Sequence, residues 1–273
     1  MKPELVIEGG RGRFSFHELW VFREVLWAFT VRQVKVKYKQ AAVGIGWAVL
    51  QPVIAAAVFA VFLGRIGGIR SEGVPYLLFA LVGMVAWTYF TTAADGAINS
   101  LVADQGLLRK VYFPREILPI AAVGAAVLDF IFGMLALCLV AAIFYGIEPQ
   151  FHLLALPVCF VILTLSAVAI GLGLSAVNVY YRDVRYALPF VLQLLLFCSP
   201  VVYPLSEVPD RWERLYAVVN PLAAAIDGTR RIILHDSWPD ATVTAAALCW
   251  AAVLTAAGMM LFKRLERGFA DRV

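Results

Sequence analysis

Long apolar runs separated by short charged segments dominate the chain. A helix needs about 20 mostly apolar residues to cross a bilayer, and each run comes close to or exceeds that length. The sequence therefore predicts an all-α, polytopic membrane protein with six transmembrane helices between residues 46 and 263. The fifth run is the shortest of the six. The predicted spans cover residues 46–63, 75–97, 117–145, 153–177, 188–203 and 243–262.

The N-terminal segment, residues 1–45, breaks this pattern. Apolar and polar residues alternate from Val34 to Lys39, which is locally typical of a strand. An isolated strand at a membrane surface would leave its backbone groups unpaired. The stretch before it places Trp20 and Trp27 among charged residues, as in helices that lie at the headgroup level. We therefore expect an interfacial helix over the whole region.

The segment from 205 to 235 is the second exception. Pro209 and Pro221 interrupt amphipathic pieces that are too broken for a span and too apolar for a free loop. We expect two short re-entrant helices that dip into the outer face of the membrane. Irregular backbone at that depth is tolerated only inside protein or beside a wet cavity, so the segment is predicted to border a pathway. A plain surface hairpin at the interface is the alternative.

Composition excludes a soluble protein. Hydrophobic residues make up 62% of the chain and charged residues 15%, with a mean hydropathy of +0.82. Globular domains average about 45–50% apolar and about 25% charged residues. The net charge of +4 points to topology rather than to nucleic acid, because 17 of the 23 lysines and arginines fall on one side of the predicted spans. The positive-inside rule then places both the N-terminus and the tail, 264–273, in the cytoplasm.

Motifs for catalysis and for metal binding are missing. The sequence contains no GxxxxGK[ST] phosphate loop, HExxH or GxSxG motif, and its three histidines and four cysteines are widely separated. We expect neither an enzyme nor a cofactor in this chain. Asp95 and Asp129 fall within predicted spans, where a carboxylate is a functional candidate by default. The alternative for Asp129 is a packing hydrogen bond inside the bundle.

Two short cytoplasmic loops, about 104–116 and 178–187, set apolar side chains beside arginine and lysine. Each loop has room for about two helical turns across the membrane surface. Such a piece could dock into the groove of a cytosolic partner. It could equally be an ordinary basic loop that touches lipid headgroups, and the residues alone do not decide between the two.

Four short motifs, in order along residues 17–267, resemble the permeases of polysaccharide-exporting ABC transporters. The first is residues 38–52, which end in GIGWAVLQP, and the second is 106–119, which contains LLRKVYFPREILP. The third is YRDV at 181–184. The fourth comprises SPVVYP at 199–204, with VP at 208–209 and NPL at 220–222. This family moves O-antigen, teichoic acid and capsule polymers across the bacterial inner membrane.

The resemblance implies a homodimer with the pathway at its interface. It also implies two copies of a separate cytoplasmic ATPase, which binds ATP and Mg. The substrate would be a lipid-linked polysaccharide, the surroundings would be membrane lipids, and no nucleic acid partner is expected. By this resemblance the two cytoplasmic loops are coupling helices that receive motion from the ATPase. Their candidate residues are Leu107, Leu108, Arg109, Lys110, Val111, Tyr112, Arg182, Asp183 and Arg185.

Aromatic side chains suit a glycan cargo, because their faces bind the C–H surfaces of sugars without requiring one pattern of hydroxyls. Most aromatic residues in membrane proteins anchor helices or fill the bundle, so both roles stay open here. The candidates for the pathway are Trp47, Trp87, Tyr89, Phe90 and Tyr203.

Two other functions remain open. One is an ABC permease for a drug or a small lipid. The other, from a different class, is a membrane-embedded enzyme that processes glycans. That enzyme would have to use the charged residues of the outer segment, which are Asp210, Glu213, Asp227, Arg230 and Arg231.

Overall fold

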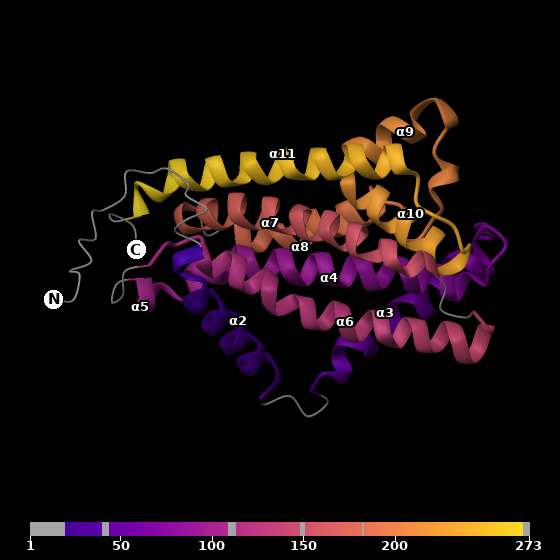
Figure 1. The fold of residues 1–273 in the computed structure, drawn as a ribbon, viewed down its shortest axis with the longest axis horizontal. Coiled ribbons are helices and arrows are strands. Elements are labelled where there is room, and N and C mark those ends of the chain that lie inside the picture. Colours follow the sequence, from indigo (N-terminus) through magenta and orange to yellow (C-terminus); the bar gives the residue numbers. More distant parts are fainter. Residues whose placement is uncertain (1–19, 40–43, 109–112, 148–150, 182, 270–273) are drawn as a thin grey trace.

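The structure is a computed structural model, and it describes residues 20–39, 44–108, 113–147, 151–181 and 183–269. Within these ranges every regular element is a helix, as the sequence predicts (Figure 1). The elements are α2 (Arg23–Tyr38), α3 (Gly46–Phe59), η1 (Ala60–Ile66), α4 (Tyr76–Ala103), α5 (Gln105–Leu108), α6 (Ile117–Tyr145), η2 (Phe151–Ala155), α7 (Leu156–Tyr180), α8 (Val184–Phe197), η3 (Leu205–Glu207), α9 (Asp210–Val219), α10 (Pro221–Leu234) and α11 (Ala241–Glu266).

Five of the helical segments in the described part of the chain are long and apolar enough to cross a membrane. They match five of the six predicted spans to within a few residues, and the third prediction coincides with α6. The first segment continues from α3 through the π-helical turn η1, and the fourth joins η2 to α7. The five are Gly46–Ile66, Tyr76–Ala103, Ile117–Tyr145, Phe151–Tyr180 and Ala241–Glu266.

The predicted fifth span corresponds to α8, which has 14 residues. At 1.5 Å per residue it is about 21 Å long, which is short of the roughly 30 Å hydrocarbon core. The helix begins four residues before the predicted start and ends at Phe197, where turns lead into Pro200. A sixth crossing would require α8 and the turns after it to span the bilayer together. The sixth crossing therefore stays a prediction, and so does the placement of both termini in the cytoplasm.

Helix α2 settles the choice between strand and helix near the N-terminus. The alternating residues 34–38 belong to its last turns, and no residue of α2 is fully buried. Trp20, just before the helix, and Trp27 are each 69% exposed. The helix runs at a slant to the main bundle and packs on α6 (Figure 1), which is the arrangement expected of an interfacial helix.

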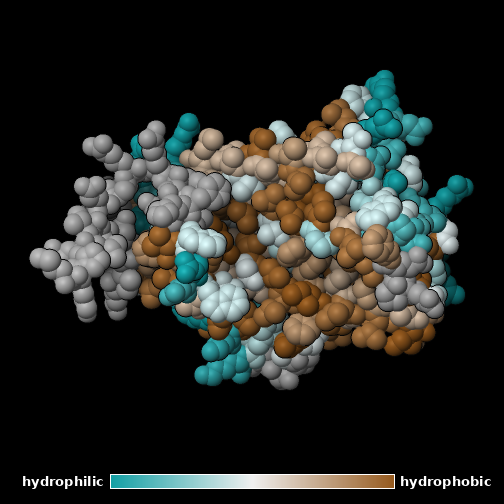
Figure 2. Space-filling view, in the orientation of Figure 1, coloured by the Kyte–Doolittle hydropathy of each residue, from teal (hydrophilic) through white to brown (hydrophobic). Residues whose placement is uncertain are grey.

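Helix α4 lies at the centre of the bundle, between α3, α6 and α7, while α11 covers α7. Small residues bring these helices close together: Gly171 of α7 lies against Ala97 of α4, and Gly258 of α11 lies against the backbone of Ala169. Close approach at small residues is the usual basis of helix packing in membranes. The outward surface over the middle of the bundle is mostly apolar, and hydrophilic residues gather towards its ends (Figure 2).

The two ends of the bundle differ in composition. One end, here called the α5 end, contains α5, the beginning of α2 and the end of α11 (Figure 1). The opposite end, the α10 end, contains α9 and α10, the two short helices that the sequence predicts between residues 205 and 235. Helix α10 is almost wholly buried against α7, α4 and α11.

Candidate coupling and translocation surfaces

The first predicted coupling segment is only partly described. Helix α5 contains Leu107 and Leu108, both half-buried, whereas Arg109, Lys110, Val111 and Tyr112 lie outside the described residues. The two leucines pack against an apolar cluster that also includes Phe113 and the ends of α7 and α11. Any force applied to α5 would therefore reach several long helices at once.

A buried ion pair joins this segment to α11. Glu116, just before α6, is fully buried, and its Oε2 accepts a hydrogen bond from Nζ of Lys263 at 2.9 Å. Lys263 also donates to Glu266 at 2.9 Å. Within the described residues the second carboxylate oxygen of Glu116 has no partner. The start of α6 and the end of α11 are thus held together by charge.

Two ion pairs tie α2 to the bundle. Lys37 and the Tyr38 hydroxyl both donate to the carboxylate of Asp129, which is 6% exposed on α6. Arg32 donates to Asp104, at the junction of α4 and α5, at 2.6 Å. Asp129 thus makes packing hydrogen bonds with α2, and its role in transport stays a prediction.

The second predicted coupling segment, 178–187, forms no separate helix among its described residues. Helix α7 continues to Tyr180 and α8 begins at Val184, while Arg182 lies outside the described residues. Asp183 and Arg185 are exposed, and the guanidinium of Arg185 lies over the ring of Tyr186. This turn is open to a partner, whereas α5 is tied into the protein's own core.

At the α10 end, Arg230 organises the turns after α8. The side chain is 1% exposed, and it donates to the carbonyls of Pro200 at 2.6 Å, Val201 at 2.5 Å and Tyr203 at 3.2 Å. Its guanidinium also lies 3.6 Å from the ring centroid of Phe79. Burial lowers the pKa of Arg230, although nearby Asp227 and Glu72 oppose that shift. A methyl group on Gly83 of α4 would overlap the Val201 carbonyl, so a glycine is needed there.

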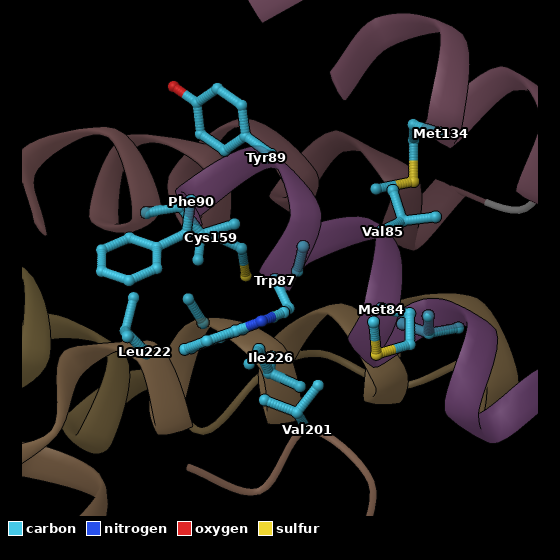
Figure 3. Packing of buried hydrophobic residues seen from close by; sticks show 14 of the residues in the cluster. Met84, Val85, Trp87, Tyr89, Phe90, Met134, Cys159, Val201, Leu222 and Ile226 are labelled. Carbon is cyan, nitrogen blue, oxygen red and sulfur yellow. The ribbon is translucent and has the colours of Figure 1, made fainter. Parts of the chain in front are cut away.

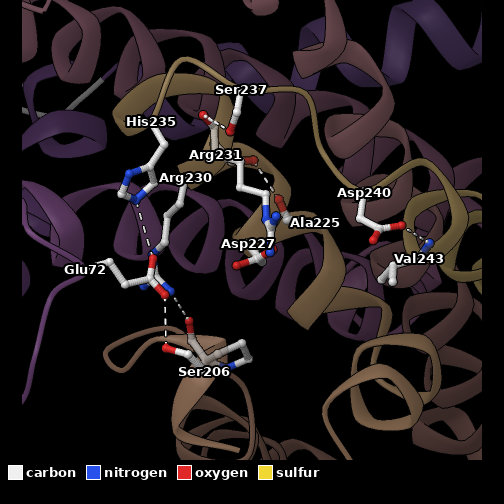
Figure 4. Close-up of polar contacts among 12 residues, drawn as sticks. Glu72, Ser206, Ala225, Asp227, Arg230, Arg231, His235, Ser237, Asp240 and Val243 are labelled. Carbon is white, nitrogen blue, oxygen red and sulfur yellow. Dashed lines mark hydrogen bonds and ion pairs between the residues drawn. The ribbon is translucent and has the colours of Figure 1, made fainter. Parts of the chain in front are cut away.

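Two histidine–carboxylate pairs surround the end of α10. His235 lies 3.4 Å from Glu72, which also accepts a hydrogen bond from Ser206 (Figure 4). The next residue, Asp236, pairs with His152 at 2.6 Å. The end of α10 is therefore connected to the loops before α4 and α7.

The five aromatic candidates for the pathway lie in different surroundings. Trp87, Tyr89 and Phe90 are at most 6% exposed and pack inside the bundle, where Tyr89 also bonds to Thr164 (Figure 3). Trp47 at the start of α3 is 49% exposed, and Tyr203 bonds to Tyr216 beside the turns after α8. The three residues of α4 thus fill the core of one chain, and Trp47 is the candidate most open to a pathway.

The arrangement described so far is a bundle of spans with a tethered helix, α2, at one end. At the other end lie the buried short helix α10 and the largely exposed short helix α9. A family model for ABC-2 type transporters matches residues 24–234. The chain belongs to the ABC-2 type transporter family. It is a multi-pass membrane protein of a transport family and not an enzyme family.

Relatives of this ABC-2 chain export polysaccharide. It is 28% identical to the O-antigen export system permease protein RfbA of Myxococcus xanthus, over 94% of this chain and 98% of that one. It is 23% identical to the protein of the same name in Klebsiella pneumoniae, over 91% of this chain and 94% of that one. The polysialic acid transport protein KpsM of Escherichia coli is 24% identical, over 76% of this chain and 80% of that one.

The ABC-2 match runs from α2 to the end of α10 and includes the elements that resemble the exporters in sequence. Sequence reasoning treated Arg230 as one charge among several in the outer segment and gave Glu116 and Lys263 no role. A buried arginine among carbonyls leaves little trace in sequence. The only available signal was an arginine in an apolar helix, at a depth where an unpaired charge would be costly.

Proposed function

We propose that this chain is the transmembrane subunit of an ABC exporter that moves a lipid-linked polysaccharide across the bacterial inner membrane. The observation that carries the proposal is similarity over more than nine-tenths of the chain to permeases named for O-antigen export. The family membership supports a transport role, and the apolar bundle supports a site in the membrane.

The energy source is proposed to be a separate ATPase, because the sequence has no phosphate loop of its own. That subunit would bind ATP and Mg. The α5 end is proposed to face the cytoplasm, since it carries most of the basic residues. The ATPase would dock there against α5 and the exposed turn at Asp183 and Arg185.

A homodimer is proposed to enclose the pathway. Helix α8 buries only Leu188 and Leu196, while Phe190, Leu194 and Phe197 are at least half exposed. Helix α3 is likewise covered on only a few positions. Such uncovered helices are available to pack against a second copy, and a dimer would accommodate a polymer better than the tightly packed single bundle.

Glycan analysis of a deletion strain tests the proposed function. Cells that lack the chain should retain polysaccharide in the cytoplasm and lose it from the surface, and the restored gene should reverse both effects. A strain that carries the chain but lacks the partner ATPase should show the same trapped polymer. Normal surface polysaccharide in the deletion strain would overturn the proposal.

A further inference from the structure

Helix α4 carries a row of polar residues that the rest of the chain covers only in part. Thr88, Thr92, Asp95 and Asn99 are spaced four, three and four residues apart, so they share one face of the helix. They are exposed or half-buried, although most of α4 is buried. We call this row the α4 polar stripe. It extends from the middle of the helix towards the α5 end, over about 17 Å at 1.5 Å per residue.

The hydroxyl groups of Thr88 and Thr92 lack a hydrogen bond that several other helical threonines of this chain make. Thr91 donates to the carbonyl of Trp87 at 3.0 Å, and Thr255 donates to that of Ala251 at 2.8 Å. Bonding back to the carbonyl four residues earlier is the usual way in which a helix satisfies a hydroxyl. In the described part of the chain, neither the Thr88 nor the Thr92 hydroxyl has a hydrogen bond. Because lipid offers a hydroxyl no hydrogen bond, these two groups are available to water or to a polar ligand.

A pocket with a mixed lining lies where the stripe meets α2 and α6. Its volume is about 380 Å³, which is within the range of about 300–1,000 Å³ usual for small-ligand sites. Thr92 and Asn99 of the stripe line it, together with Gln33 of α2. The Gln33 side chain, like the two threonines, has no hydrogen-bond partner among the described residues.

The charges of the pocket are already balanced. Its two cations, Arg32 and Lys37, are paired with Asp104 and Asp129. A free phosphate would have to compete with these carboxylates. The remaining polar groups are two amides, Gln33 and Asn99, and two hydroxyls, Thr92 and Ser100, facing alanines of α6. The Asn99 amide already donates to Asp95 and the Ser100 hydroxyl to the carbonyl of Ala97. Among the described residues, Gln33 and Thr92 are therefore the groups left to bind a ligand. Groups that both donate and accept hydrogen bonds, set beside small apolar surfaces, match the hydroxyls and C–H faces of a neutral sugar.

We propose that this pocket is a sugar-binding site at the cytoplasmic entrance of the pathway, and that the α4 polar stripe leads the glycan from it towards the middle of the membrane. The inference rests on the proposed function, because it identifies where the exported polymer is first held. It assigns the contacts with sugar to hydroxyl and amide groups. Trp87 and Tyr89 on the same helix are buried in the core, and Phe90 lines a separate apolar cavity beside α7, α8 and α11.

Paired threonine substitutions test the stripe. Thr88→Val and Thr92→Val together remove two unpaired hydroxyls with little change in shape, and export in the complete transporter should fall by about tenfold. Thr91→Val is the matched control, since its hydroxyl is already bonded within the helix, and its export should stay within twofold of wild type. Export by the double variant at the level of the Thr91→Val control would overturn the inference.

Photo-crosslinking in cells provides a readout that does not depend on the variants' activity. A photoreactive amino acid at position 92 should yield adducts that react with a stain for the cell's own polysaccharide. The same amino acid at Val161, which is 43% exposed on α7, is the control and should yield none. Absence of an adduct at position 92, or equal adducts at both positions, would contradict the sugar-binding site. The proposed function would still stand if the deletion strain traps polymer in the cytoplasm. A deletion strain with normal surface polymer would instead remove the proposed function itself.

Discussion

Both ends of the bundle contain ion pairs, and the α10 end adds a buried contact of a different kind. At the α5 end, ion pairs such as Arg32–Asp104 and Lys263–Glu116 join α2 to the start of α5 and the start of α6 to α11. At the α10 end, a single buried guanidinium, that of Arg230, binds the backbone carbonyls of the turns after α8. The Arg32–Asp104 pair, whose arginine is 48% exposed, can separate and form again at low cost. The buried Lys263–Glu116 pair is costlier to break. A buried arginine cannot leave its carbonyls without leaving them unpaired.

This difference suits the proposed function. The α5 end would receive motion from an ATPase and pass it to long helices, so its contacts must allow rearrangement. The α10 end would close the outer side between transport steps, which favours a fixed structure. We therefore expect substitutions at the α10 end to affect folding, and substitutions at the α5 end to affect transport more than folding.

Arg230→Leu should have the largest effect on stability. The substitution removes the hydrogen bonds to three carbonyls, and each buried carbonyl left without a partner costs about 1–3 kcal/mol. Most of the protein should therefore fail to reach a folded, monodisperse state. Fluorescence-detected size exclusion in detergent measures this outcome. Arg231→Leu is the control, because Arg231 is 42% exposed and pairs with Asp227 one turn away, and it should behave like wild type. Equal behaviour of the two variants would show that the α10 end does not depend on Arg230.

Asp129→Leu should weaken the attachment of α2. The protein should still fold and insert, because Lys37 is 44% exposed and can turn to solvent. The loss of the hydrogen bonds to the Asp129 carboxylate should weaken the contact between α2 and α6 by about 1–3 kcal/mol. Trypsin should then cut α2 several times faster in membrane vesicles. Asp104→Asn, which breaks the more exposed pair with Arg32, should change the rate much less. Unchanged cleavage in Asp129→Leu would show that the ion pair does not hold α2.

Leu108→Asp should separate transport from folding. The half-buried leucine packs at the edge of the cluster around Phe113, and a charge there should disturb the position of α5. We expect about a tenfold loss of export with a normal amount of protein in the membrane. Leu135→Asp is not a suitable control, because Leu135 faces outward from a span. Wild-type export by Leu108→Asp would exclude α5 from coupling.

Arg185→Ala, in the exposed turn, tests the second docking surface separately.

Asp240→Ala should have the smallest effect. Asp240 accepts hydrogen bonds from the backbone of Thr242 and Val243 at the start of α11, and loss of such a cap costs about 1 kcal/mol. These bonds, chiefly the one from Val243, lower its pKa in the folded protein. The stabilisation by the ionised cap is therefore present above the pKa of Asp240 in the unfolded chain. It is lost as the pH falls through the lower pKa of Asp240 in the folded protein. Asp240→Asn should keep the cap at all pH values, and thermal unfolding at pH 7 distinguishes the two variants.

The sequence was sufficient for the long helices because twenty-residue apolar runs have few alternatives in a membrane. The prediction for α6 was correct at both ends, and the helical form of α2 followed from the cost of an unpaired strand. The length of α8 was less accessible, since its apolar run continues past Phe197 into the turns at Ser199 and Pro200. Hydropathy alone does not show where a helix stops inside such a run.

The pathway residues stay a prediction, because the surroundings of a side chain in one chain do not test its role in transport. Trp87, Tyr89 and Phe90 have the composition of a glycan path, yet they pack within one chain. Burial depends on neighbours that are far away in sequence, such as Ile226 and Leu222 of α10 (Figure 3). The α4 polar stripe was visible in the spacing of its residues, but only the structure shows that this face is covered only in part.

ATP-driven uptake of polymer by inside-out membrane vesicles tests the central claim most directly. Vesicles that contain the chain and its ATPase, supplied with the cell's lipid-linked polysaccharide, should move the polymer into the lumen when ATP is added and should protect it there from a glycan-degrading enzyme. Vesicles without the chain should protect none. Protection that is equal with and without ATP, or equal with and without the chain, would contradict the account of this protein as the membrane subunit of a polysaccharide exporter.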